Sequence, residues 1–142
     1  MKKFEDYVKE KIVKRITPDI NRAIYLKKEA LDRRKFILDL VNSKGISQEN
    51  ANYIIELAYG VVMELIRSKM LEKGFNASGN FAHEAEISFL SKLGFSEDKI
   101  IFANDLRKAR NRILYYGRKF DKEFALKVLE FMEEVVKKLG KI

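Results

Sequence analysis

The sequence has no cysteine and no tryptophan, and it contains one proline and one histidine. Without cysteine the chain can form neither disulfides nor thiolate metal sites, so its composition does not indicate an oxidising compartment. We therefore expect a soluble, cytoplasmic protein. The longest apolar runs, such as "AYGVVM", fall far short of the ~20 residues that a membrane-spanning helix requires, which predicts that no membrane is a partner.

Basic side chains are scarce in the middle of the chain and abundant at its ends. Residues 1–44 hold 13 basic and 7 acidic side chains, residues 45–99 hold 5 and 8, and residues 100–142 hold 11 and 6, which gives a formal net charge of +8. This asymmetry is compatible with a polyanionic partner such as RNA. Lysine- and arginine-rich surfaces also promote solubility, so charge alone leaves RNA binding open.

Helical periodicity runs through the whole chain, and no segment alternates as a strand does, so we predict an all-α fold. A single domain over residues 1–142 should form an up-and-down bundle of five to six helices. Its helices are predicted at about 2–15, 18–42, 48–73, 81–93, 97–116 and 121–139. Their expected N-caps are Thr17 (before Pro18), Ser47, Ser96 and Asp121, and the expected terminators are Gly45, Gly74, Gly94, Gly117 and Gly140.

The helix predicted at 48–73 carries a wide apolar stripe, which is typical of a central helix. Its apolar positions are Ile54, Ile55, Leu57, Ala58, Val61, Val62, Leu65 and Ile66. Gly60 interrupts this helix at a cost of ~1 kcal/mol relative to alanine. That glycine indicates the close approach of another backbone or a slight bend, and simple tolerance is the alternative.

Two short segments resemble known motifs but lack their functional residues. "GFNASGNF" at 74–81 has the glycine spacing of a phosphate-binding loop, yet Asn80 and Phe81 replace its lysine and hydroxyl residue. "HEAEI" at 83–87 begins as a zinc-binding HExxH motif, yet Ile87 replaces the second histidine. We therefore predict neither a metal nor a cofactor, and we expect His83 to form a local hydrogen bond at a helix start.

The segment "RKARNRILYYG" at 107–117 combines four basic residues with a helical apolar period. Its predicted core stripe is Phe102, Leu106, Ala109, Ile113 and Tyr116. The other side, over about 140°, presents Arg107, Arg110, Asn111, Leu114, Tyr115 and Arg118. Guanidinium groups bind phosphate oxygens in pairs, and aromatic rings stack on bases. The candidate RNA-binding residues are Arg107, Arg110, Asn111, Arg112 and Arg118.

A solvated face is the alternative interpretation of these arginines. They would then pair with Glu84, Glu86 or acidic groups of a partner. Leu114 lies among the arginines, and an apolar residue there indicates a covered face, for example in a two-fold dimer.

Residues 50–135 resemble the HEPN superfamily of small helical proteins, through "RSKMLEKGFNAS", "AHEAEISFLSKLGFSE" and "LRKARNRILYYG". The hallmark of that family is an arginine, often followed by a polar residue, with a histidine five positions after the arginine. Arg110 and Asn111 match, but Tyr115 stands in the place of the histidine. The resemblance implies a HEPN-like core over residues 45–142, preceded by N-terminal helices in 1–44, and a homodimer.

Nuclease members of that family cleave RNA without a metal: the ribose 2′-hydroxyl attacks the phosphate, histidine moves protons and arginine steadies the phosphate. The resemblance therefore implies catalytic positions at Arg110, Asn111 and Tyr115. A phenol with a pKa of about 10 is a poor base at neutral pH. His83 is the only imidazole that could replace it. We expect a catalytically degenerate protein that binds RNA or nucleotide phosphate.

Two alternatives remain. One is an active, metal-independent endoribonuclease toxin whose antitoxin is a minimal nucleotidyltransferase, with Tyr115 and Tyr116 as acceptors by analogy. Cleavage of RNA in the presence of a chelator would distinguish it. The other is a non-enzymatic dimeric interaction module, which would bind neither nucleotide nor RNA at low salt.

Overall fold

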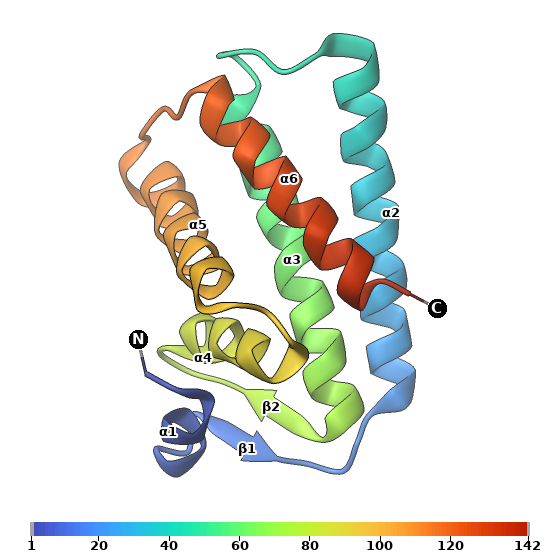
Figure 1. The fold of residues 1–142 in the computed structure, drawn as a ribbon, viewed down its shortest axis with the longest axis vertical. Helices are drawn as coiled ribbons and strands as arrows, with labels where there is room; N and C mark the ends of the chain where they lie inside the picture. Colours follow the sequence, from blue (N-terminus) through green and yellow to red (C-terminus); the bar gives the residue numbers. More distant parts are fainter. Residues whose placement is uncertain (1, 142) are drawn as a thin grey trace.

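The computed structural model describes residues 2–141 and confirms the all-α helical bundle. The long helices α2, α3, α5 and α6 run alternately up and down, and the short helix α4 lies at one end of the bundle (Figure 1). The elements are α1 (Phe4–Lys9), β1 (Val13–Arg15), α2 (Ile20–Lys44), α3 (Ala51–Lys73), β2 (Phe75–Ala77), α4 (Ala82–Ser88), the 3-10 helix η1 (Phe89–Leu93), α5 (Glu97–Tyr116) and α6 (Lys122–Leu139).

Helix α3 is the central element, as its wide apolar stripe predicted. It packs against α2 and α6 and also contacts α4 and α5 (Figure 1). Its fully buried side chains include Ile54, Ile55, Leu65, Ile66, Met70 and Leu71. No helix within residues 2–141 is both long enough and apolar enough to cross a bilayer.

The prediction for the N-terminal segment was wrong in part, because the helix expected at 2–15 ends at Lys9. Lys11 adopts a positive φ of 62°, which an α-helix cannot accommodate. The chain then forms β1, which pairs antiparallel with β2 so that Val13 faces Ala77 and Arg15 faces Phe75. Strands of three residues are too short to show an alternating pattern, so periodicity could not reveal them.

Some helix starts also differ from the predicted caps. The N-cap of α2 is Asp19 rather than Thr17, because an Asp19 carboxylate oxygen accepts a hydrogen bond from the Arg22 amide at 3.1 Å. Helix α3 starts at Ala51, later than expected, and its N-cap is Asn50 rather than Ser47. The Ser47 hydroxyl instead accepts a hydrogen bond from the Asn50 amide at 3.2 Å. The predicted N-cap of α6, Asp121, is confirmed, because its side chain accepts a hydrogen bond from the Phe124 amide. Ser96 occupies the predicted N-cap position of α5, but its side chain forms no capping hydrogen bond.

Gly60 marks a close approach, but the approaching group is a side chain and not a backbone. A Cβ on Gly60 would lie 2.7 Å from an Nη atom of Arg33 on α2. Arg33 crosses this position to pair with Glu64, one turn further along α3. Burial raises the pKa of Glu64 despite the opposing effect of Arg33.

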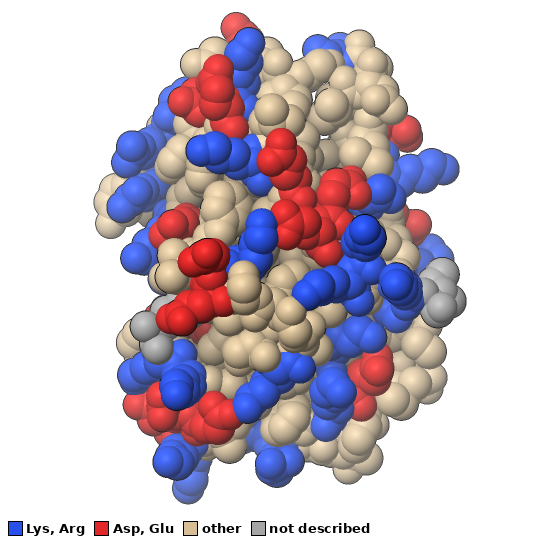
Figure 2. Space-filling view, viewed as in Figure 1, with Lys and Arg blue, Asp and Glu red and all other residues tan. Residues whose placement is uncertain are grey.

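Basic and acidic side chains are intermixed on the face shown in Figure 2. The excess of positive charge therefore does not form one continuous patch on that side of the molecule. Any specific anion site has to come from a local arrangement of side chains.

Candidate functional site

Helix α5 buries most of its predicted apolar stripe. Leu106 and Ala109 are buried, and Phe102 and Ile113 pack against the core. Tyr116 was expected in the same stripe, yet 82% of it is exposed. Tyr116 is the last residue of the helix, before the chain turns at Gly117, and the packed part of the stripe ends one turn earlier at Ile113.

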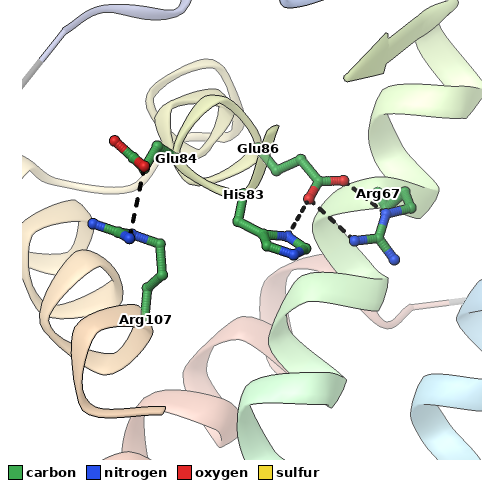
Figure 3. Close-up of polar contacts among 5 residues, drawn as sticks. All are labelled: Arg67, His83, Glu84, Glu86 and Arg107. Atoms are coloured by element: carbon green, nitrogen blue, oxygen red, sulfur yellow. Dashed lines mark hydrogen bonds and ion pairs between the residues drawn. The ribbon is translucent and has the colours of Figure 1, made fainter. Parts of the chain in front are cut away.

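Two arginines of α5, one turn apart, face α3 and α4. The guanidinium carbon of Arg110 lies 5.4 Å from the centroid of the Tyr59 ring on α3, which is a cation–π contact. Arg107 donates from Nε to the Asn104 side-chain oxygen at 3.0 Å, and its Nη1 lies 3.7 Å from a carboxylate oxygen of Glu84 on α4 (Figure 3). The predicted pairing with Glu84 is thus present for Arg107.

Glu86 on α4 is the centre of a second polar group (Figure 3). Its side chain is only 3% exposed and receives hydrogen bonds from Arg67 Nε at 2.7 Å and Arg67 Nη2 at 3.1 Å. His83 Nδ1 lies 3.1 Å from the same carboxylate. Burial alone would raise the pKa of Glu86, but the hydrogen bonds from His83 and Arg67 outweigh it and hold this pKa below its usual value.

An ionised carboxylate only accepts hydrogen bonds, so Glu86 fixes the tautomer of His83. The hydrogen of a neutral His83 ring must lie on Nδ1, facing Glu86, which leaves Nε2 with a free lone pair. The predicted local hydrogen bond of His83 at the start of α4 is therefore confirmed. Half of the His83 side chain remains exposed.

Tyr59 connects these two groups. Its ring centroid lies 6.5 Å from that of His83, in an edge-on arrangement, and Arg110 covers the ring. Side chains from α4 and α5 therefore meet at an aromatic ring of α3. We call this set the Tyr59 cluster, and it comprises Tyr59 and Arg67 from α3, His83 and Glu86 from α4, and Arg107 and Arg110 from α5.

Sequence reasoning missed Tyr59 and Arg67. Tyr59 lies within an apolar run and resembled any other core position. Arg67 follows the apolar stripe of α3 and is 19 residues away from Glu86 in the chain. Only the packing of α4 on α3 makes them part of the site.

Other candidate residues lie outside the cluster. Asn111 is partly exposed, whereas Arg112 and Arg118 are exposed and Tyr115 is 72% exposed. At ~100° per residue, Arg112 points about 160° away from Arg110, and Tyr115 about 140° away. Arg118 is not on the helical face at all, because it follows Gly117 and its guanidinium stacks on Phe120 at 5.1 Å. The binding roles of these residues stay predictions.

Residues 2–141 contain no group of three or more histidine, cysteine, aspartate or glutamate side chains placed to hold a metal ion. A scan against protein-family models found no matching family, and searches among curated proteins and solved structures found no match to the chain. The resemblance to the HEPN superfamily thus stays a hypothesis carried by the residues of α5.

Proposed function

We propose that this protein binds phosphate groups of RNA or nucleotides at the Tyr59 cluster. The observation that carries the proposal is the state of Arg110. Its guanidinium is held against the Tyr59 ring and has no carboxylate partner within residues 2–141. A guanidinium fixed by stacking loses little further freedom when it binds phosphate, and its fork of N–H donors matches phosphate oxygens.

The neighbours of Arg110 support the same function. Arg107 lies one turn away, and its contact with Glu84 at 3.7 Å is a loose one that leaves guanidinium donors available to an anion. In the HEPN resemblance, Arg110 occupies the position of the arginine that steadies the phosphate, and Asn111 occupies the polar position that follows it. Tyr115, in the place of the motif histidine, is exposed and turned away from Arg110, which favours binding without catalysis by that tyrosine.

The test compares two arginines of the same helix. Binding of fluorescently labelled single-stranded RNA is measured by anisotropy at low salt for the wild type, Arg110→Ala and Arg112→Ala. We expect Arg110→Ala to weaken binding about tenfold or more, because a charge-assisted contact is lost. Arg112→Ala removes the same charge from the opposite side of α5 and should change binding less than about threefold. Equal effects of the two substitutions, or no binding, would refute the proposal.

A second candidate is a metal-independent ribonuclease, and the pairing of His83 with Glu86 favours it. The carboxylate orients the imidazole, and Nε2 is free to accept a proton from a ribose hydroxyl held near Arg110. RNA would be incubated with EDTA and wild type, His83→Gln or Arg110→Ala, followed by separation of the products. Cleavage by the wild type alone would establish this activity, and intact RNA in every sample would exclude it.

The remaining partner predictions concern the end of α5. Leu114 is 47% exposed, and it lies next to the exposed Tyr115 and Tyr116. This apolar group is accessible to a second copy of the chain, and both tyrosines are accessible to a minimal nucleotidyltransferase. Light scattering tests the homodimer, and mass spectrometry after incubation with such an enzyme and nucleotide tests the modification.

A further inference from the structure

The hydroxyl group of Tyr59 is an unusual feature of the interior. It is buried, the residue as a whole is 5% exposed, and no atom within residues 2–141 forms a hydrogen bond with it. The large majority of buried side-chain polar atoms in folded proteins have a hydrogen-bond partner, and an unsatisfied one destabilises the fold. The missing partner of this hydroxyl therefore requires an explanation.

The chemistry of the surroundings defines that partner. Burial raises the pKa of Tyr59 to about 12, although Arg110, Arg107 and Arg67 oppose this effect, so the phenol keeps its proton at neutral pH. A protonated phenol that lacks a partner needs an acceptor. The Glu86 carboxylate, which acts electrostatically on this hydroxyl, already accepts hydrogen bonds from Arg67 and His83.

The charges around Tyr59 select an anionic acceptor. The guanidinium groups of Arg110, Arg107 and Arg67 act electrostatically on its hydroxyl, and the Glu86 carboxylate acts in the opposite direction. Arg67 is committed to Glu86, whereas Arg110 has no acidic partner in the described part of the chain. An oxygen that carries negative charge would satisfy both the hydroxyl and Arg110.

From these observations we infer that Tyr59 and Arg110 form a subsite for a terminal phosphate, that is, a phosphate monoester on a nucleotide or at the end of an RNA. This inference rests on the proposed function. The hydroxyl lies below the surface, so a group must protrude to reach it. An internal phosphodiester carries substituents on two of its oxygens, whereas a terminal phosphate is substituted on one oxygen only and presents three free oxygens to the hydroxyl and Arg110.

Tyr59→Phe is the decisive variant, because it removes the hydroxyl and keeps the ring that supports Arg110. Without ligand, the variant should be more stable than the wild type, with a melting temperature higher by a few degrees, since an unsatisfied buried group is gone. With ligand, it should bind the terminal phosphate about tenfold more weakly. A purely structural role of Tyr59 would not produce this opposite pair of effects.

The binding experiment uses one RNA sequence prepared with a 5′-phosphate, with a 3′-phosphate, and with hydroxyl groups at both ends. The wild type should prefer one phosphorylated form about tenfold or more, and Tyr59→Phe should lose that preference. AMP should compete better than adenosine, and inorganic phosphate, used as a third competitor, reports whether the phosphate alone is sufficient.

Equal binding of all three RNAs by the wild type would overturn the inference, as would a preference that survives in Tyr59→Phe. A lower melting temperature of the unliganded variant would also overturn it, because the hydroxyl would then have an internal partner. The two proposals fail separately. If Arg110→Ala weakens all three RNAs equally, phosphate binding at Arg110 stands and only the terminal subsite falls.

Discussion

Glu86 shows how single residues set the properties of this site. It is nearly inaccessible, and two hydrogen-bond donors from different parts of the chain, Arg67 and His83, keep it ionised. The carboxylate therefore joins α3 to α4 and fixes the orientation of the His83 ring. Both effects depend on its charge.

A pH titration of stability tests this role. The pKa of Glu86 is lower in the folded than in the unfolded chain, so its ionised form stabilises the fold above the unfolded pKa near 4.5, and this contribution is lost as pH falls through the lower, folded pKa. Glu86→Gln should lower the melting temperature at pH 7, and the difference from wild type should shrink below about pH 4.5. Thermal unfolding followed by circular dichroism measures both.

Glu64 provides the matched comparison because burial raises its pKa above the usual value. Ionised Glu64 lowers the stability of the fold at pH values above its pKa in the folded chain. This loss of stability disappears as the pH falls through that value. The wild type should therefore gain stability relative to Glu64→Gln on acidification, which is the reverse of the trend for Glu86→Gln. The same trend in both variants would contradict the assigned directions.

At the scale of elements, glycines in the left-handed region end two of the three helices that build the site. Gly74 ends α3 with a φ of 84°, and Gly117 ends α5 with a φ of 61°. The two positions differ in their surroundings. A Cβ on Gly74 would lie 2.7 Å from the backbone oxygen of Ile16, whereas a Cβ on Gly117 would meet nothing within 4 Å.

Alanine substitutions separate backbone strain from this close approach. Gly117→Ala should destabilise the protein by about 1–2 kcal/mol, the cost of a left-handed conformation for an L-residue. Gly74→Ala adds a clash with a backbone atom and should cost at least about 1 kcal/mol more. It should also disturb the hydrogen bond that the amide of Ile16, the residue directly after β1, donates to the Gly74 backbone oxygen. Urea unfolding measures the free energy of unfolding of both variants. Equal losses in the two would show that the backbone at the end of β1 can move away from the added Cβ at little cost.

At the scale of the whole molecule, net charge and site charge have different consequences. The chain carries +8, but the visible face of Figure 2 mixes both signs, and the proposed phosphate contacts come from a few arginines of one cluster. Binding through a local cluster and binding through the overall charge predict different salt dependences. The salt dependence of RNA affinity therefore reports how many basic side chains of the protein contact phosphate groups.

RNA affinity measured from 50 to 200 mM salt distinguishes these cases. With about three phosphate contacts, binding to a single strand should weaken roughly 20-fold over this range, whereas eight contacts would weaken it by about 10³-fold. Arg110→Ala should lower the slope by about one contact, and Arg112→Ala should leave it unchanged. A slope near zero in the wild type would mean that phosphate contacts do not hold the RNA.

The sequence by itself determined the helices and most of their ends. Asp121, Gly74 and Gly117 form hydrogen bonds with backbone groups a few residues away, so local chemistry identifies them wherever the helix later packs. The bond from His83 to Glu86 is equally local, because residues three apart in a helix are neighbours. The Arg110–Asn111 pair was visible in the sequence for the same reason.

Tertiary structure decided which of the candidate side chains meet. Tyr59 and Arg110 are 51 positions apart, and their contact depends on how α5 is rotated against α3, which no local pattern encodes. The same rotation turns Arg112 away from the cluster, and the end of the packed stripe leaves Tyr116 in solvent. The strand pair formed by residues 13–15 and 75–77 arises between distant segments as well. Local hydrogen bonds fix where helices begin and end, but burial of their apolar faces against each other fixes the site.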